Sequence, residues 1–252
     1  MSKSPILFWT SIGLNCLLIL VGIVIIANKG GITYLKTKWN ESNKRMVNTD
    51  KNEEKTFYRT DHYLNRNEYF RALPSSSSDI LMVGNSLTEQ ADWAELLGNA
   101  KVKNRGISGD TTIGVLNRMA EHIQQKPQKL FLMIGTNDIW RGEKKPENIA
   151  NQYRNILNVI QKESPNTVVY IQSLLPVNNQ EFLLTIDNST IEMINQELKQ
   201  LAQEFSLVYL DIYPELINKN NLLNADFTRD GVHLNVLGYL QWAKVIKPYI
   251  ND

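Results

Sequence analysis

The sequence has little cysteine, little histidine and almost no net charge. Its single cysteine, Cys16, excludes an internal disulfide and any zinc site built on several cysteines. The 252-residue chain carries 27 Lys and Arg against 26 Asp and Glu, a formal net charge of +1 at pH 7. It therefore lacks the basic excess that would indicate a nucleic-acid partner and the acidic excess that would gather cations. Only His62, His122 and His233 are available as imidazole bases.

Charged residues are also absent from the segment between Pro5 and Ala27. As a helix with a rise of about 1.5 Å per residue, residues 5–27 would extend roughly 34 Å, enough to cross the hydrocarbon core of a membrane. The segment is longer than the apolar part of a secretory signal and does not end in a small-x-small cleavage site. The sequence therefore predicts an uncleaved, single-pass transmembrane anchor over residues 1–28.

The charges around this segment favour one orientation in the membrane. Lys3 is the one charged side chain before the apolar run, whereas five Lys and Arg follow it within residues 29–45. The positive-inside rule then favours a cytoplasmic location for the C-terminal part of the chain. A large domain can be translocated regardless of such charges, so the side of the membrane stays open at this point.

Residues 29–78 have the composition of a polar connector. Its first part is highly charged and lacks a core pattern. Between residues 57 and 73, aromatic residues recur at a spacing that predicts a helix packed on the following domain. Pro74 and the four serines after it then break the chain. His62 falls within this helix, where we expect a surface or packing role.

From Asp79 onward, short apolar runs alternate with longer amphipathic runs. The short runs predict strands at 79–84, 101–106, 129–135, 167–173 and 207–211. The longer runs predict helices at 87–98, 112–125, 146–163, 187–205 and 236–250. This alternation predicts a three-layer α/β/α domain over residues 79–252, with five parallel strands and helices on both faces of the sheet. Ligands of such sheets bind beyond the carboxyl ends of the strands.

Ser86 directly follows the first predicted strand and opens a helix. A serine at that position can act as a nucleophile if a base takes its proton, and its N–H lies where a helix favours an anion. The alternative is structural, because Ser86 and Glu89 fit a capping box. Considered alone, Ser86 fits the capping role better.

His233 is the best placed base for Ser86, and Asp230 lies three residues before it. On one turn the carboxylate could orient the imidazole and stabilise its charged form. A simple turn with a packed or exposed histidine explains the same residues. His122 falls within a predicted helix and is expected on the surface. Three other aspartates are rival partners without such short spacing, namely Asp138, Asp211 and Asp226.

Two further residues could stabilise an oxyanion. Asn137 follows the third predicted strand and carries an amide donor, and Gly109 follows the second and could offer an unhindered N–H. A helix cap for Asn137 and an ordinary turn for Gly109 are the alternatives. All of these residues follow strands or precede the last helix, so the sheet would bring them to one edge.

Four short blocks resemble those of the SGNH (GDSL-type) hydrolases, in the order typical of that family and over about residues 79–250. The blocks are Gly84-Asn85-Ser86-Leu87, NRGISGDTT at 104–112, Gly135-Thr136-Asn137-Asp138, and Asp230-Gly231-Val232-His233-Leu234. One departure is Asn85, which stands where the family usually has aspartate. Because that aspartate is not a member of the catalytic triad, the resemblance implies that the chemistry survives.

The resemblance implies a flavodoxin-like fold with no metal and no cofactor. By position, Ser86 would be the nucleophile, His233 the base and Asp230 its orienting carboxylate. The N–H groups of Ser86 and Gly109 and the side chain of Asn137 would form the oxyanion hole. The residues of the second and third blocks are similar to those of the branch with lysophospholipase-like, platelet-activating-factor-acetylhydrolase-like and sugar O-acetylesterase-like members.

That branch implies a serine-dependent carboxylic ester hydrolase that removes a short acyl group, such as acetyl, from a glycan or lipid-like ester. Many members of that branch face the periplasm or exterior, against the charge rule above. Together with the predicted anchor, this gives the expectation of a single-pass protein of a bacterial cytoplasmic (inner) membrane with its catalytic domain outside. Two alternatives remain: an acyltransferase on the same fold, and a non-catalytic, membrane-tethered binding domain. The sequence does not indicate an oligomeric state.

Overall fold

A computed structural model describes residues 31, 59–143, 145–182 and 184–250. The chain divides into two compact units, Met1–Phe57 and Tyr58–Asp252, and the description below concerns the second. The predicted anchor at residues 1–28 and most of the connector lie outside the described residues. Among the helices that the structure does describe, none is both long enough and apolar enough to span a bilayer.

The centre of the described unit is a parallel sheet of five strands in the order β2-β1-β3-β4-β5. All four neighbouring pairs are parallel, and Ile80 in β1 pairs with Val102 in β2 and Lys129 in β3. The strands are β1 (Ile80–Gly84), β2 (Val102–Gly106), β3 (Lys129–Met133), β4 (Val168–Gln172) and β5 (Val208–Leu210). The predicted five-stranded parallel sheet is confirmed, each strand lying within its predicted run.

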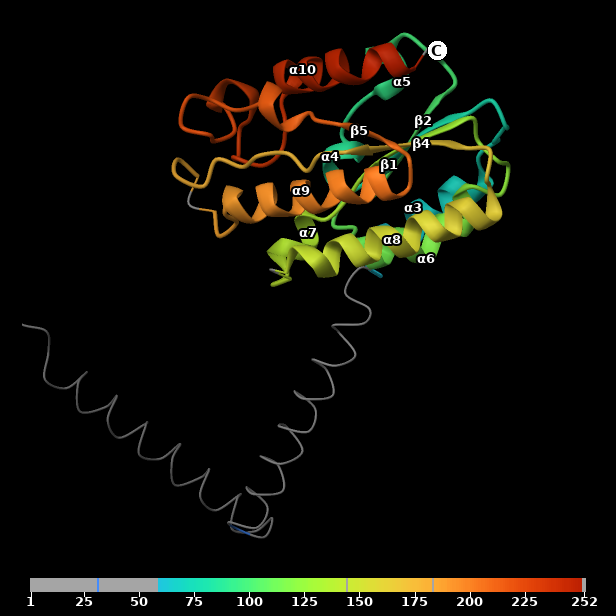
Figure 1. Cartoon of the computed structure of the whole chain (residues 1–252), viewed down its shortest axis with the longest axis horizontal. Helices are drawn as coiled ribbons and strands as arrows, with labels where there is room; N and C mark the ends of the chain where they lie inside the picture. The colour runs from blue at the N-terminus through green and yellow to red at the C-terminus, as the bar shows by residue number, and fades with distance from the viewer. Residues whose placement is uncertain (1–30, 32–58, 144, 183, 251–252) are drawn as a thin grey trace, which may run out of the picture. The chain divides into compact units, whose positions relative to one another are not determined.

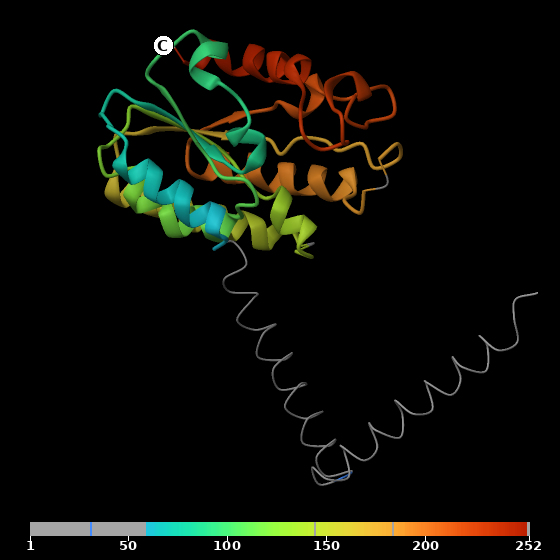
Figure 2. The same ribbon diagram turned by 180° about the vertical axis from the view of Figure 1, so that it is seen from behind.

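Helices cover both faces of this sheet, as Figures 1 and 2 show. The helices α5 and α10 lie on one face, and α6, α8 and α9 lie side by side on the other. Right-handed crossovers produce this division. The connection from β1 to β2 runs toward one edge of the sheet, and the connections from β2 through β3 and β4 to β5 run toward the other edge, so their helices lie on opposite faces. The main helices are α5 (Trp93–Leu97), α6 (Thr112–His122), α8 (Pro146–Glu163), α9 (Asn188–Glu204) and α10 (Val236–Ile246).

The predicted helix at 87–98 is wrong as a single element, because it is two short helices, α4 (Ser86–Glu89) and α5. The break follows from side chains that bind the carbonyl groups of α4. The Trp93 indole donates to Thr88 O at 2.8 Å, and Asn104 Nδ2 donates to the carbonyls of Thr88, Glu89 and Ala91 at 2.9–3.0 Å. These donors satisfy the carbonyls without a continuous helix.

The aromatic segment before the domain forms α3 (Asp61–Ala72), which packs on α6. Thr60 caps it by accepting from Tyr63 N at 3.1 Å. The Tyr63 hydroxyl donates to Gly114 O at 2.9 Å, and Arg71 donates to Glu121 at 2.7 and 2.8 Å. The helix therefore lies within the expected 57–73 segment and packs on the domain.

Close backbone contacts place α4 directly on the end of β2. A Cβ added to Gly106 would lie 2.3 Å from Glu89 N and 2.8 Å from Asn85 O. Such distances are far below van der Waals contact, so a side chain at residue 106 would push α4 away from the sheet. The absence of that side chain fixes where α4 begins.

Candidate active site

Ser86 is the first residue of α4 and lies at the carboxyl end of β1. The residue that caps the helix is Asn85, whose Oδ1 accepts from Leu87 N at 3.0 Å. The capping box considered for Ser86 and Glu89 is therefore wrong, because Glu89 instead accepts from Ser108 N at 2.7 Å. Asn85 also explains how the fold tolerates the departure from aspartate, since its amide oxygen accepts the same kind of capping bond.

The Ser86 hydroxyl lies against the histidine predicted as its base. Ser86 Oγ is 3.0 Å from His233 Nε2, although 147 residues separate them in the chain. The other ring nitrogen, Nδ1, is 2.7 Å from Asp230 Oδ2. Because the carboxylate can only accept from Nδ1–H, Nε2 is left as the acceptor for the serine proton.

The turn that carries Asp230 and His233 is held by its own hydrogen bonds. Asp230 Oδ1 accepts from the N–H groups of Val232 and His233 at 2.9 and 2.8 Å. Thr228 Oγ1 accepts from Gly231 N at 2.9 Å and donates to His233 O at 2.8 Å. Gly231 has a φ of +82°, which favours glycine. These bonds fix the position of the imidazole relative to the carboxylate.

The charge of Asp230 is stabilised by the same contacts. Partial burial alone would raise the pKa of this carboxyl, but hydrogen bonds from the His233 ring and from the N–H groups of Val232 and His233 outweigh it and lower the pKa below its usual range. The carboxylate is therefore ionised at neutral pH and suited to stabilise a protonated imidazole.

The α10 helix positions this turn against α4. The Tyr239 hydroxyl of α10 donates to Leu87 O at 2.8 Å, and the Trp242 indole donates to Gln172 Oε1 in β4 at 2.7 Å. Trp93 packs edge-on against Trp242, with ring centroids 4.8 Å apart. The element that follows His233 is thereby tied to the element that carries Ser86.

Gly109 lies in the loop after β2, and Asn137 lies after β3 and lines the same cavity as Ser86. Gly109 has a φ of +79°, and nothing lies within 4 Å of the place where a Cβ would stand. Asn137, in the short helix α7 (Thr136–Trp140), donates one amide hydrogen to Asp110 O at 2.8 Å. Its second amide hydrogen is left for a ligand, since an amide nitrogen carries two. Gly135 occupies the cap position of α7, so the cap predicted as an alternative for Asn137 is wrong.

A buried ion pair that the sequence did not reveal fixes the Gly109 loop. Arg118 Nε donates to Asp110 Oδ2 at 2.9 Å, and both side chains are fully buried. Arg118 Nη2 also donates to Gly84 O at 3.2 Å, which ties α6 to the residue before Asn85. Removing one member of such a pair would leave the other charge buried and uncompensated.

A second bond connects the two loops. Asp138, the neighbour of Asn137, accepts from Thr112 Oγ1 at 2.5 Å and from Thr112 N at 3.1 and 3.2 Å. Burial raises the pKa of Asp138 to about 6, although the Thr112 hydrogen bonds oppose the shift. Asp138 is thus a structural residue that joins α6 to α7, and the possibility that it partners a histidine is wrong.

We expect an Asp138→Asn substitution to change how stability depends on pH. Because the folded-state pKa is raised above the ordinary value of 3.8, the folded chain holds a proton that the unfolded chain releases between about pH 4 and 6. The wild type should therefore lose stability relative to the variant as pH rises through this window, by on the order of 2–3 kcal/mol. Urea unfolding of both proteins at several pH values measures the difference, and a constant gap from pH 4 to 8 would refute the assignment.

The remaining histidines do not contact Ser86. His62 Nε2 is 3.1 Å from both Glu89 carboxylate oxygens, and its side chain is half exposed. His122 was expected on the surface, but this is wrong, because α3 covers it. Its Nε2 lies 3.2 Å from Asn67 Oδ1 and 3.3 Å from Arg118 Nη1, and burial lowers its pKa well below the usual value.

Ser86 and His233 open into a cavity of about 330 Å³. Its polar walls carry the hydroxyl, the imidazole and the Asn137 amide, and its apolar walls come from the helix and loop side chains around them. The lining residues are Asn85, Ser86, Leu87, Thr136, Asn137, Trp140, Leu184, Asp230, Val232 and His233. Trp140 is half exposed at the edge of this cavity.

Comparison with protein families places this geometry in context. Residues 82–240 match the model of the GDSL-like Lipase/Acylhydrolase family. Platelet-activating factor acetylhydrolase IB subunit alpha2 of Rattus norvegicus is 28% identical over 177 residues, covering 68% of this chain and 73% of that protein. An acetylxylan esterase of Geobacillus stearothermophilus is 29% identical over 168 residues, covering 62% of this chain and 73% of that protein.

Solved structures show the same fold. A protein from Streptococcus pneumonia, whose name refers to platelet activating factor, is 28% identical and superposes with a TM-score of 0.70. That match covers 75% of this chain and 92% of the other. A GDSL-like lipase from Bacteroides thetaiotaomicron, 23% identical with a TM-score of 0.65, covers 75% and 96% and supports the fold alone.

Proposed function

The chain belongs to the GDSL-like lipase/acylhydrolase family and is a carboxylic ester hydrolase, and from this premise we propose that Ser86 is its nucleophile. One observation carries the proposal: His233 lies between Ser86 Oγ at 3.0 Å and Asp230 Oδ2 at 2.7 Å. These distances are those of a nucleophile, a base and an orienting carboxylate in hydrogen-bond contact.

In the proposed first step, His233 Nε2 takes the proton of Ser86 Oγ while Oγ bonds to the ester carbonyl carbon. The carbonyl oxygen becomes an oxyanion that accepts from the N–H groups of Ser86 and Gly109 and from the Asn137 amide. The tetrahedral species collapses when His233 returns the proton to the leaving alcohol, which leaves an acyl group on Ser86. Water then attacks this acyl-enzyme with His233 as base, and the acid and free serine are released.

The proposed substrate is an ester of a short acyl group, such as acetyl, on a glycan or lipid-like alcohol. The cavity of about 330 Å³ has an apolar wall of Leu87, Trp140, Leu184 and Val232 that would surround a small acyl chain. The names of two relatives, an acetylhydrolase and an acetylxylan esterase, describe the removal of acetyl groups by those proteins.

Hydrolysis of p-nitrophenyl esters of increasing acyl length tests this proposal. We expect kcat/KM to be highest for acetate or propionate and to fall by at least about tenfold by octanoate. A methylene that the pocket can bury contributes about 0.8 kcal/mol of binding free energy, and a methylene that the pocket excludes does not make this contribution. An increase of kcat/KM with chain length would overturn the short-acyl proposal while leaving Ser86 as nucleophile. An acetylated xylo-oligosaccharide and an acceptor sugar in the same assay distinguish free acetate from acyl transfer.

We expect Asn137→Ala to lower kcat by about 100- to 1000-fold with a smaller change in KM, because the donated bond strengthens as the oxyanion forms. Loss of the bond to Asp110 O should cost about 1 kcal/mol of stability. Asn148→Ala, which removes an exposed amide that donates to Glu143, is the matched control and should retain full activity. Equal kcat values for Asn137→Ala and the wild type would remove Asn137 from the oxyanion hole.

We also propose that residues 5–27 anchor the enzyme in a bacterial cytoplasmic membrane with the catalytic domain outside. The uncharged length of the segment supports the anchor, and the family branch supports the outer location against the positive-inside rule. Reporter fusions at Asp252 test the side: signal from an alkaline phosphatase fusion alone supports the proposal, and signal from a cytoplasmic reporter alone reverses it.

A further inference from the structure

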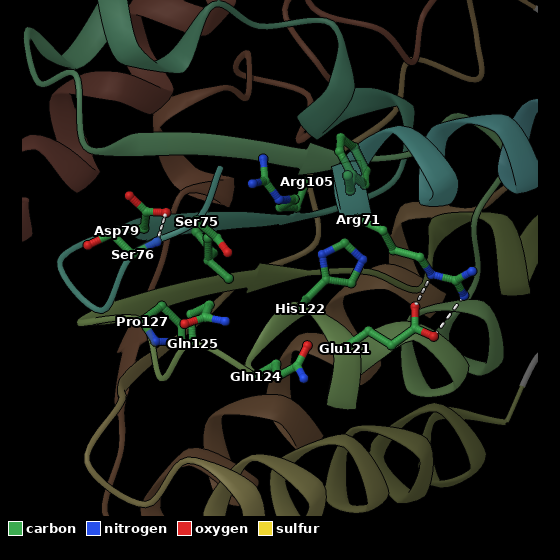
Figure 3. Close-up of a pocket in the computed structure, with 12 residues that line it drawn as sticks. Arg71, Ser75, Ser76, Asp79, Arg105, Glu121, His122, Gln124, Gln125 and Pro127 are labelled. Carbon is green, nitrogen blue, oxygen red and sulfur yellow. Dashed lines mark hydrogen bonds and ion pairs between the residues drawn. The ribbon is translucent and has the colours of Figure 1, made fainter. Parts of the chain in front are cut away.

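A second cavity, of about 320 Å³, lies away from Ser86, between α3, α6 and the strands β1 and β2. Figure 3 shows it with Arg105 and His122 on one side and Asp79 with Ser76 on another. None of the residues that line it also lines the cavity at Ser86. The lining residues are Phe70, Arg71, Ser75, Ser76, Asp79, Leu81, Arg105, Glu121, His122, Gln124, Gln125 and Pro127.

Arg105 is the central feature of this cavity. Its side chain comes from β2, is only 5% exposed, and stacks over the Phe70 ring with its guanidinium carbon 5.0 Å from the ring centroid. Nη1 donates to Asn104 O at 2.9 Å. Within residues 59–143, 145–182 and 184–250, no carboxylate oxygen lies within 4.0 Å of this guanidinium, and its other N–H groups have no acceptor.

The other arginines around the cavity differ from Arg105 in this respect. Arg71 makes two bonds to the Glu121 carboxylate, and Arg118 pairs with Asp110. A buried guanidinium group is normally paired with a carboxylate, as that of Arg118 is, whereas Arg71 is more than half exposed. Arg105 lines the cavity without such a bonded carboxylate, although the charge of Asp79 acts on it, and its rigid planar fork matches the oxygens of a carboxylate or phosphate.

The rest of the cavity would suit a small polar molecule attached to that anion. His122 also lines the cavity, and its Nε2 is engaged by Asn67 and Arg118. Asp79 Oδ2 accepts from Ser76 N at 2.9 Å, and the carboxylate is itself 5% exposed. Such acceptors, with the Gln124 and Gln125 amides at the edge, can bind hydroxyl groups.

We propose that this cavity is a second ligand site, which binds a small hydroxylated oxyanion, a carboxylate or phosphate, through Arg105. The anion would accept from the free N–H groups of the guanidinium, and the hydroxyls would bind Asp79 and the glutamines. The site is separate from the ester cavity, because Asp79 precedes β1 whereas Ser86 follows it. The proposal does not depend on the role of Ser86.

Calorimetric titration of the full-length chain with inorganic phosphate, glucuronate and glucose tests the proposal. We expect saturable, millimolar binding of glucuronate, of phosphate, or of both, and no binding of neutral glucose. The two anions distinguish carboxylate from phosphate as the preferred group. Absence of saturable binding by either anion would overturn the proposal.

Variants locate the site. Arg105→Gln should weaken anion binding by at least about tenfold, and Arg105→Lys should retain part of it as a point charge without the fork. Ser75→Trp fills the mouth without removing a buried group and should block binding in a folded protein, even if the Arg105 variants fold poorly. Arg154→Gln, at an exposed ion pair on α8, is the matched control and should bind like the wild type. Unchanged binding in Ser75→Trp and Arg105→Gln would overturn the proposal.

Discussion

Replacing Ser86 by alanine should reduce kcat for p-nitrophenyl acetate by on the order of 10⁴-fold or more, because no nucleophile would remain to form the acyl-enzyme. The fold should survive this change. The Ser86 hydroxyl contacts His233, whereas the cap of α4 is provided by Asn85, so removal of the hydroxyl leaves the helix start intact. Steady-state kinetics together with a thermal unfolding curve measure both effects.

Ser108→Ala is the matched control for this variant. Ser108 is also a serine near the site, but its hydroxyl donates to Glu89 rather than to a histidine. We expect its kcat to fall by no more than about tenfold, through a small shift of the Gly109 loop. If Ser86→Ala kept more than a few per cent of wild-type activity while Ser108→Ala lost it, the nucleophile would have to be reassigned.

Asp230→Asn should lower kcat by about 10³- to 10⁴-fold with little change in KM. Oδ1 of Asp230 already accepts from the N–H groups of Val232 and His233, so the amide oxygen of asparagine would take that place. The amide nitrogen would then face His233 Nδ1, where Oδ2 now accepts. This favours the imidazole tautomer that carries its proton on Nε2, which donates to Ser86 and cannot take its proton.

Asp226→Asn provides the comparison for Asp230→Asn. Asp226 is an exposed carboxylate four residues before Asp230, and it was a rival partner for the histidine. We expect this control to keep wild-type kcat and unfolding temperature. Because the pKa of Asp230 is lowered, the wild-type carboxylate should stay ionised in mildly acidic solution and add no separate loss of activity there. Equal kcat values in the two variants would show that Asp230 does not orient the base.

The strands and the proposed catalytic residues could be predicted because their signals are local or lie in short blocks. Each strand is a compact apolar run, and parallel strands place the residues that follow them at one edge of the sheet. Ser86, Gly109 and Asn137 follow from that rule, whereas His233, which precedes the last helix, was found from its spacing to Asp230 and from the last block. The structure brings Ser86 and His233 into contact, and Asn137 lines the same cavity and donates to the carbonyl of Asp110, the neighbour of Gly109.

The interactions that support the site were not predictable, because they join residues that are distant in sequence. The break between α4 and α5 depends on Asn104, in another strand, binding three carbonyls. The capping box at Ser86 failed because Asn85 is the better placed acceptor and Ser108 occupies Glu89. The Asp110–Arg118 pair was missed because a spacing of eight residues, with Asp110 before the start of α6, gives no i,i+3 or i,i+4 signal.

The cavity at Arg105 illustrates the same limit. In the sequence Arg105 is one polar residue inside a predicted strand, with nothing to distinguish it from Lys103. That no carboxylate of the described residues pairs with Arg105 is known only from the folded structure, in which α3 packs on α6 and Phe70 covers the guanidinium. A volume bounded by α3, α6, β1 and β2 is a property of packing, which single-residue patterns do not contain.

The central claim is that Ser86 carries the acyl group, and labelling with a fluorophosphonate tests it most directly. The reagent should phosphonylate Ser86 Oγ stoichiometrically and abolish esterase activity at the same rate, because only a serine activated by His233 attacks it quickly. Tandem mass spectrometry of the peptide containing Asn85-Ser86-Leu87 locates the adduct. The account predicts one adduct on Ser86 in the wild type and none in Ser86→Ala, whereas an adduct on another residue of an inactivated enzyme would contradict it.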